Sequence, residues 1–234
     1  MPKTIEFEID QPKFAAALHA AVSVADRRSS NQPILASVLL RADAHGLSMT
    51  ATDMQVSVRE VLDAAAISHG GVCVNIAHLL NVVRSLPAKP LRVKGLDNHW
   101  ISVKTGRSEF KLMGQGPGDF PEIPEADKTC AWTVVPCAGL RDAIDRTMFS
   151  VSTDEARTNL NGLYIESTGQ RMTAVSTDGH RLTKLTAEAP FPKTDKIIIP
   201  RRGLAELRKF IDKRPGEVAM ASNGPSGHLF VRAG

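Results

Sequence analysis

The residue types best suited to catalysis lie around one short stretch of the chain. Asp178 and His180 are two positions apart, with Ser176 beside them and Ser152 as another candidate nucleophile. A carboxylate, an imidazole and a hydroxyl can together perform general acid–base or nucleophilic catalysis. However, an Asp and a His on either side of a glycine more often cap and orient a turn, and no nucleophile-elbow sequence is present. The pattern therefore favours a structural turn, and we expect no enzymatic activity.

Neither a metal ion nor a cofactor is predicted. The seven histidines are scattered, and no HExxH or CxxC spacing occurs. Cys73, Cys130 and Cys137 are an odd number of cysteines, which indicates neither a disulfide framework nor a zinc site. The stretch Gln115–Gly118, with the sequence QGPG, is not followed by GK[ST], so it does not fit a phosphate-binding loop.

The composition predicts a soluble globular protein of the cytoplasm. The chain has 234 residues, of which 42% are hydrophobic, and this is enough for one large or two ordinary domains with real cores. The longest apolar runs, such as Ile197–Ile199, are far too short to span a membrane. The N-terminus lacks the apolar core of a secretory signal. We therefore expect no membrane partner.

The segment that carries Asp178 is predicted to form a β-hairpin. In residues 171–182, RMTAVSTDGHRL, the pair Asp178-Gly179 stands between two extended runs. This is a strong hairpin signal, because both central residues of a type I′ turn need a positive φ. His180, Arg181 and Leu182 are then expected to leave a tight, rigid turn. The same pattern occurs at residues 46–53, GLSMTATD, which place Asp53 125 positions before Asp178.

This offset of 125 residues recurs along the chain and predicts tandem copies of one fold. The first helix drifts by one position, so that Phe14 and Leu18 match Leu140 and Ile144. The other matches are Val38–Leu40 with Leu163–Ile165, Val72 and Val74 with Ile197 and Ile199, Leu79 with Leu204, and Val93 with Val218.

The expected fold class is α+β, with tandem modules that each consist of a pair of βαβββ halves and carry two helices packed on antiparallel sheets. The predicted domains are 1–114 and 129–234, joined by a Pro/Gly-rich acidic linker, 115–128, in which neither helix nor sheet should persist. In the first module, strands are predicted over 4–9, 36–41, 47–52, 55–61, 71–75, 91–94, 100–104 and 109–113, with a helix from Pro12 and another between Asn75 and Pro87.

The second module is expected to lack its last strand. Residues 100–106 correspond to 228–234, and the strand predicted over 109–113 then has no counterpart. Because proteins normally avoid an unpaired sheet edge, we expect the chain to be a fragment or a partner to supply the strand.

Basic residues on the predicted helices suggest contact with phosphate groups. Arg201 and Arg208 lie seven positions apart on one helix, and Arg28 and Arg84 lie on or beside helices of the first module. Basic residues without interleaved aromatics suit diffuse phosphate contact and not base readout or stacking. A solvated helix face remains the simpler explanation, since a net charge of +4 requires no polyanionic partner.

The chain resembles the bacterial sliding clamp, the beta subunit of DNA polymerase III, in a series of motifs. They occur in the family's order over nearly the whole chain and cover the N-terminal and most of the central domain, with the third domain absent. Only TDGHRL is specific by itself, and together the motifs are decisive. They are Gln32–Leu35, Thr105–Phe110, Asp119–Pro121, Phe149-Ser150, Leu160–Gly162, Thr177–Leu182 and Ile199–Leu207.

The resemblance implies a DNA replication protein that is not an enzyme. Members of the family join such modules edge to edge into a closed homodimeric ring around duplex DNA, with sheets outside and helices inside, and act as the processivity factor of the polymerase. The residues implied to contact DNA, independently of its sequence, are Arg27 or Arg28, Arg84, Thr158, Asn159, Arg201, Arg202 and Arg208.

The resemblance also implies a groove that binds short peptides. In the family, these peptides come from the DNA polymerase III catalytic subunit, the clamp loader, other polymerases and repair proteins. On this chain the groove would consist of Leu160, Thr177, Gly179, His180, Arg181 and Leu182. Because the third domain supplies the other groove wall in the family, we expect reduced peptide affinity here.

The chain departs from the family at several positions, which leaves alternatives open. Thr158 and Asn159 replace aromatics found in some relatives, and Ala77 or His78 replaces a basic residue, so these DNA contacts should be weaker. Two near-complete modules could imitate two-domain clamps that close as trimers, or the chain could be a monomer. The competing functions are a peptide-docking scaffold that does not encircle DNA and a hydrolase that uses Asp178 and His180.

Overall fold

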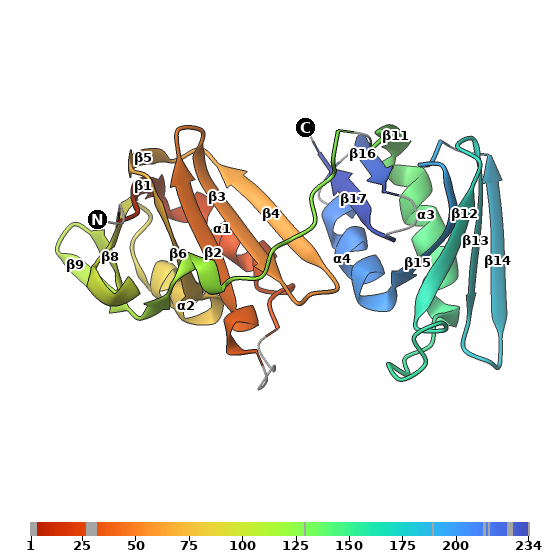
Figure 1. Cartoon of the computed structure of the whole chain (residues 1–234), viewed down its shortest axis with the longest axis horizontal. Helices are drawn as coiled ribbons and strands as arrows, with labels where there is room; N and C mark the ends of the chain where they lie inside the picture. Colours follow the sequence, from red (N-terminus) through yellow and green to blue (C-terminus); the bar gives the residue numbers. More distant parts are fainter. Residues whose placement is uncertain are drawn as a thin grey trace. The chain divides into compact units, whose positions relative to one another are not determined.

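The computed structural model of the chain describes residues 4–26, 32–128, 130–188, 190–212, 214, 216–223 and 227–233. The chain divides into two compact units, Met1–Ile123 (unit 1) and Pro124–Gly234 (unit 2). Figure 1 shows helices and sheets in each unit, in agreement with the α+β class predicted from the sequence.

Unit 1 contains two five-stranded antiparallel sheets. The strand orders are β5-β1-β7-β8-β9 and β10-β6-β2-β3-β4, so each half of the unit contributes its first strand to the sheet of the other half. The elements are β1 (Glu6–Asp10), α1 (Gln11–Ala21), β2 (Ser37–Asp43), β3 (Gly46–Thr52), β4 (Ser57–Leu62), β5 (Ala65–Ser68), β6 (Gly70–Asn75), α2 (Ile76–Ser85), β7 (Pro90–Gly95), β8 (Ile101–Thr105), β9 (Ser108–Leu112) and β10 (Gly114–Gln115).

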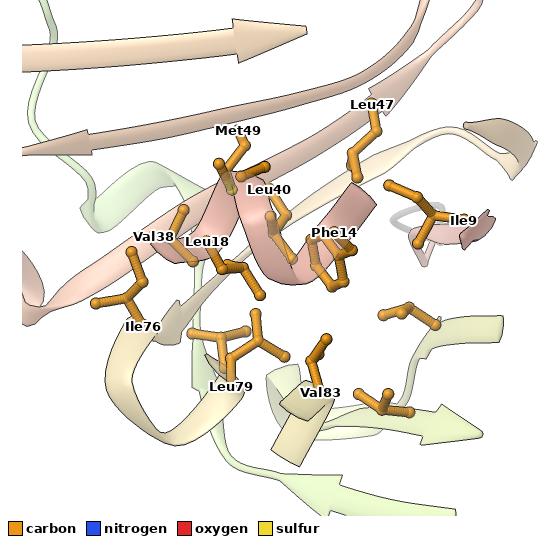
Figure 2. Packing of buried hydrophobic residues seen from close by; sticks show 14 of the residues in the cluster. Ile9, Phe14, Leu18, Val38, Leu40, Leu47, Met49, Ile76, Leu79 and Val83 are labelled. Carbon is orange, nitrogen blue, oxygen red and sulfur yellow. The ribbon is translucent and has the colours of Figure 1, made fainter. Parts of the chain in front are cut away.

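The two helices of unit 1 begin where the sequence predicts and bury one face each. Pro12 lies in the first turn of α1, where its missing N–H costs nothing. The Asn75 side chain caps α2 by accepting hydrogen bonds from the N–H groups of Ala77 and His78, both at 3.1 Å. Figure 2 shows Phe14 of α1 and Leu79 of α2 within the core, among side chains of the strands.

Unit 2 repeats this arrangement with fewer strands. Its sheets, over the described residues, are β14-β13-β12-β15 and β11-β16-β17, again antiparallel. The elements are β11 (Thr133–Pro136), α3 (Cys137–Thr147), β12 (Gly162–Ser167), β13 (Arg171–Thr177), β14 (Leu182–Glu188), β15 (Thr194–Pro200), α4 (Arg201–Asp212), β16 (Glu217–Ser222) and β17 (Leu229–Arg232). A separate buried core joins both helices to both sheets.

The strand pairings agree with the predicted 125-residue repeat and correct one of the residue correspondences between the two units. β3 and β13 begin 125 residues apart, as do β2 and β12. The sequence repeat predicts Val218 as the counterpart of Val93. However, Val93 pairs with Val103 on β8, whereas Met220 pairs with Val231 on β17. Since Val103 and Val231 occupy equivalent strand positions, the counterpart of Val93 is Met220. The strands predicted from the sequence also do not include β5, a short edge strand that pairs with β1.

Residues 114–123 are part of unit 1 and carry regular structure, contrary to the expectation that no sheet would persist there. Gly114 pairs with Val74, and Gln115 pairs with Cys73, which adds β10 to the edge of the sheet. Phe120 is 7% exposed and packs in a small second core with Cys73 and Leu39. The glycines and prolines therefore shape this segment without preventing a two-residue strand, since Gly114 and Gln115 retain their backbone donors.

Candidate functional site

The predicted hairpin exists in unit 2, but its turn is longer than a type I′ turn. Thr177 pairs with Leu182, so the loop consists of the four residues 178–181. Gly179 has a φ of 91°, and Asp178 does not have a positive φ. The Asp178 side chain supports the loop by accepting hydrogen bonds from the N–H groups of His180 and Arg181, both at 3.0 Å. These hydrogen bonds from the loop N–H groups to the Asp178 side chain stabilise a four-residue loop in which only Gly179 has a positive φ, so the two positive φ values of a type I′ turn are not needed.

The ionisation of Asp178 follows from these contacts. The N–H groups of His180 and Arg181, and then the Arg181 guanidinium, lower the pKa of the Asp178 carboxyl to about 2. A carboxylate with so low a pKa is a poor general base near neutral pH. The hydroxyl of Ser176 is also engaged, since it donates to the carbonyl oxygen of Thr147 at 2.8 Å. Asp178 and Ser176 therefore have structural contacts, which gives the hydrolase hypothesis no support.

Two large apolar side chains at or near this turn are exposed to solvent. Leu182 is 64% exposed and Phe149 is 57% exposed. The Arg181 guanidinium lies 5.6 Å from the centroid of the Phe149 ring, and the hydroxyls of Ser150 and Thr183 are in hydrogen-bond contact. Phe149 was not among the predicted groove residues, although the Phe149-Ser150 motif pointed to it. It belongs with Leu182 in a candidate binding surface.

Leu160 is connected to the same region through the segment before it. The N–H of Ser152 donates to the carbonyl oxygen of Leu160 at 3.0 Å, and the Asn161 side chain donates to the carbonyl oxygen of Ser152 at 2.9 Å. Thr177 also supports the turn, because its hydroxyl donates to the carbonyl oxygen of Arg181 at 2.8 Å. The structure therefore brings Thr177, Gly179, His180, Arg181 and Leu182 together in one turn, and joins Leu160 to them through residues 150–152.

Arg201 and Arg208, which are both predicted to contact DNA, have partners within unit 2. Arg208 of α4 donates to both carboxylate oxygens of Asp145 on α3, at 2.7 and 3.0 Å, and also contacts Asp212. The hydrogen bond from Arg208 lowers the pKa of the Asp145 carboxyl. Arg201 donates to the carbonyl oxygens of Met148 and Val151, at 3.2 and 2.8 Å. Each guanidinium thus ties α4 to α3 or to the segment that follows it.

Four further residues predicted to contact DNA are exposed. Arg84 lies in the last turn of α2, Arg202 in the first turn of α4, and Thr158 and Asn159 in the loop before β12. Arg27 and Arg28 lie outside the described residues, so the choice between them stays a prediction.

The described residues offer neither a metal site nor a membrane-spanning helix. No cluster of three or more His, Cys, Asp or Glu side chains suited to a metal ion occurs among the described residues. No described helix combines the length and apolar character needed to cross a membrane.

Both units match known protein domains. Residues 5–124 match the N-terminal domain of the DNA polymerase III beta subunit, and residues 134–232 match its central domain. The beta sliding clamp of Pseudomonas aeruginosa is 33% identical over 220 residues, covering 92% of this chain and 59% of the relative. That of Vibrio cholerae is 32% identical over 231 residues, covering 98% and 62%. The chain thus spans about 60% of the length of these relatives.

Solved structures agree with this match. The sliding clamp of Caulobacter crescentus superposes with a TM-score of 0.86 at 30% identity, covering 94% of this chain and 60% of that one. The Pseudomonas aeruginosa clamp bound to griselimycin gives a TM-score of 0.82 at 30% identity, covering 97% and 63%. The Bacillus subtilis clamp, at 21% identity, supports the fold alone, with a TM-score of 0.88. This chain belongs to the family of the DNA polymerase III beta subunit, the bacterial beta sliding clamp.

Proposed function

We propose that this chain is part of a sliding clamp that encircles duplex DNA and keeps the replicative polymerase on it. The observation that carries the proposal is the repeated module: the same strand order and helix pair occur twice in one chain of this family. A closed ring holds DNA by topology, so its retention does not depend on tight binding to any base. Self-association would complete the ring in the whole protein, and no enzymatic step or cofactor is needed.

The helices of the two units are the proposed DNA-facing surface. A clamp that slides needs phosphate contacts that exchange quickly, and ion pairs within the protein weaken such contacts by neutralising the basic side chains. The Arg208–Asp145 pair fits this requirement. Arg84, Arg202, Thr158 and Asn159 are exposed and are proposed to contact phosphates directly, together with Arg27 or Arg28. Arg201 and Arg208 would contribute mainly to the local electrostatic potential.

The turn at residues 177–182 is the proposed docking site for peptides of partner proteins. These partners would be the polymerase III catalytic subunit, the clamp loader, other polymerases and repair proteins. The side chains of Leu182 and Phe149 offer apolar contact area, while the hydrogen bonds of Asp178 and Thr177 hold the backbone in place. Because the turn is already ordered, peptide binding would pay less ordering entropy.

Retention on DNA tests the ring. The whole protein that contains this chain, loaded on a nicked circular plasmid, should remain bound after gel filtration and should be lost within minutes once the plasmid is cut. Loss that is equal with and without cutting would reject topological retention. The matched control is the same plasmid incubated with a restriction enzyme that has no site on it.

Peptide binding tests the docking site separately. A fluorescein-labelled peptide from the polymerase III catalytic subunit should bind this chain, and Leu182→Ala should weaken binding about tenfold, because the exposed Leu182 side chain would be buried under the peptide. Ile198→Ala is the control, since Ile198 is also exposed, at 39%, but lies on β15 away from the turn. Equal effects of the two variants would contradict the assignment.

A second candidate function is a docking scaffold that does not encircle DNA. The hydrogen bonds of Arg201 to the carbonyl oxygens of Met148 and Val151 favour it, because they hold one of the predicted phosphate contacts within unit 2. Such a scaffold would bind the labelled peptide, but it would dissociate from circular plasmid and from cut plasmid at the same rate. The retention experiment therefore separates the two functions.

A further inference from the structure

The turn that forms the proposed peptide site in unit 2 has a structural twin in unit 1. The Asp53 side chain accepts hydrogen bonds from the N–H groups of Gln55 and Val56, at 2.9 and 2.7 Å. The Thr52 hydroxyl accepts from the N–H of Met54 at 3.0 Å and donates to the carbonyl oxygen of Val56 at 3.0 Å. Asp178 and Thr177 make the same set of bonds 125 residues later.

A cavity of about 370 Å³ lies beside this twin turn. Its volume is near the small end of the range found for ligand pockets, roughly 300–1,000 Å³, which suits one or two side chains and not a large molecule. The Met54 side chain, 59% exposed, forms part of the wall. The lining residues are Gln32, Pro33, Ile34, Met54, Gln115, Asp119 and Pro121.

The far wall of the cavity is held rigidly against the sheet. Gln115 belongs to β10, which pairs with β6, and the N–H of Asp119 donates to the carbonyl oxygen of Gly116 at 3.2 Å. Phe120, between Asp119 and Pro121, is buried against Cys73 and Leu39. This wall of the cavity is therefore held by strand pairing and core packing, which reduces the part of the entropic cost of binding that would come from ordering it.

Two further features of the residues at this cavity bear on what it could bind. Met54 has a φ of 73°, a conformation that side chains other than glycine rarely adopt and that is found preferentially at functional sites. The Asp119 carboxylate is exposed at the rim and makes no side-chain hydrogen bond or ion pair with any residue that the structure describes. An apolar wall with one unpaired carboxylate is complementary to an apolar side chain next to a cation.

We propose that this cavity is a second docking site, which takes an apolar side chain of a short peptide with a lysine or arginine beside it. The inference extends the proposed function, because it assigns to unit 1 the kind of ligand proposed for the turn of unit 2. The charges of the two sites differ: Arg181 and His180 belong to the turn in unit 2, whereas Asp119 stands beside the turn in unit 1. In unit 2 the Arg181 guanidinium donates to the Asp178 carboxylate at 2.9 Å, so the charge preference proposed for the unit 1 site comes from Asp119 and has no mirror image in unit 2.

Methyl NMR of the whole chain tests this proposal. The chain is labelled with ¹³C at the methyl groups of methionine, isoleucine δ1 and leucine, and is titrated with the peptide acetyl-Gly-Lys-Leu-Gly-Leu-Lys-Gly-amide. We expect saturable shifts of the Met54 and Ile34 methyl signals, with the buried Met172 of β13 as the unchanged control. The same peptide with glutamate in place of both lysines should bind more weakly.

Variants of the cavity separate specific binding from a general surface effect. Asp119→Asn should lower the affinity for the lysine peptide about two- to fivefold, as expected for the loss of one exposed charge pair. The affinity for the glutamate peptide should not decrease. Met54→Gly should weaken binding about tenfold, read at Ile34, through loss of apolar contact. A glycine suits the positive φ at this position, so this variant should keep the turn folded.

Several outcomes would overturn the inference. Absence of saturable shifts at Met54 and Ile34, or shifts that Asp119→Asn and Met54→Gly leave unchanged, would reject a docking site. Shifts that depend on protein concentration without peptide would identify a second copy of the chain as the occupant. The polymerase peptide and the Leu182 methyl signal serve as the reference for unit 2. Should that reference fail while Met54 responds, the proposed function of the unit 2 turn fails and the inference stands.

Discussion

The turns at residues 52–57 and 177–182 share a backbone and differ in nearly every exposed side chain. In both, a threonine hydroxyl and an aspartate carboxylate satisfy the loop N–H groups. The residues that follow the aspartate are Met54, Gln55, Val56 and Ser57 in one turn and Gly179, His180, Arg181 and Leu182 in the other. The comparison shows that the threonine and the aspartate are common to both turns, whereas the four positions after the aspartate carry different side chains, although the first of these has a positive φ in both turns.

The helices of the two units differ in a related way. The only fully charged side chains on α1 and α2 are Lys13 and Arg84, whereas α3 and α4 carry six basic and four acidic residues. Ion pairs connect these charges, both within each helix, as in Arg146–Asp142, and between helices, as in Arg208–Asp145. Equivalent elements of the repeat thus present a charge-poor surface in unit 1 and a charge-rich but largely neutralised one in unit 2.

Removal of Phe14 would test most strongly whether the two units are stabilised separately. Phe14 is fully buried and packs edge-to-face on Phe7, with 6.0 Å between ring centroids. Phe14→Ala should lower the free energy of unfolding of unit 1 by about 3–5 kcal/mol. Each unit contains one tryptophan, Trp100 or Trp132, so fluorescence of the variants Trp132→Phe and Trp100→Phe reports each transition in urea.

The matched change in unit 2 is Leu140→Ala, at the position equivalent to Phe14, where the side chain is 5% exposed. It should lower the stability reported by Trp132 by about 2–5 kcal/mol and affect the Trp100 signal by much less. If both signals shifted together in both variants, the units would unfold as one body, and the comparison between them as separate modules would not hold.

Exchange of the positive-φ residues tests whether the two turns share one backbone. Gly179→Ala should lower the stability of unit 2 by about 1–2 kcal/mol, because an alanine at a φ of 91° is strained. Met54→Gly removes the corresponding strain in unit 1 but makes the unfolded chain more flexible, so the net gain should be about 0.5 kcal/mol. Urea unfolding followed by the two tryptophans measures both. A loss of stability in Met54→Gly would mean that the Met54 side chain stabilises its turn.

Acid should loosen the unit 2 turn through Asp178. The pKa of this carboxyl is about 2 in the folded chain, below the ordinary value near 3.8. The ionised Asp178 carboxylate therefore stabilises the folded turn fully when the pH is above the ordinary pKa of 3.8, and this stabilisation is lost as the pH falls from 3.8 through about 2. The amide signals of His180 and Arg181 should move over this interval in NMR spectra. Asp178→Asn should abolish that movement, whereas Asp53→Asn, in the twin turn, should leave it intact.

The repeat was visible in the sequence because it depends on local residues. Turn aspartates, apolar alternation and the Asn75 cap leave recognisable patterns, and they placed most strands and all four helices. The exchange of β1 and β6 between sheets was not predictable, since it depends on pairing between residues such as Phe7 and Val93 that lie far apart in the chain. Phe149 was missed for the same reason: its place beside Arg181 arises from tertiary packing, and its family motif contains only two residues.

The ion pair between Arg208 of α4 and Asp145 of α3 tests whether the neutralised charges on the unit 2 helices matter, and the expected effect is small. Asp145 is 53% exposed, so its pair with Arg208 should contribute only about 0.2–1 kcal/mol to stability. Asp145→Asn should therefore leave the chain folded while releasing part of the Arg208 charge. We expect the affinity for a duplex oligonucleotide at low salt to rise about two- to threefold. The slope of the logarithm of the binding constant against the logarithm of the salt concentration should become steeper by less than about 1, which is the change for one added phosphate contact.

The control for this last change is Asp97→Asn, which alters the net charge equally but lies in the 3-10 turn Asp97–His99 of unit 1. If DNA affinity depends on the helices, only Asp145→Asn should raise it, as measured by fluorescence anisotropy over a series of salt concentrations. An equal rise in both variants would mean that DNA responds to overall charge alone. The ion pairs of α3 and α4 would then have no part in keeping the phosphate contacts weak, and the charge difference between the helices of the two units would not bear on sliding.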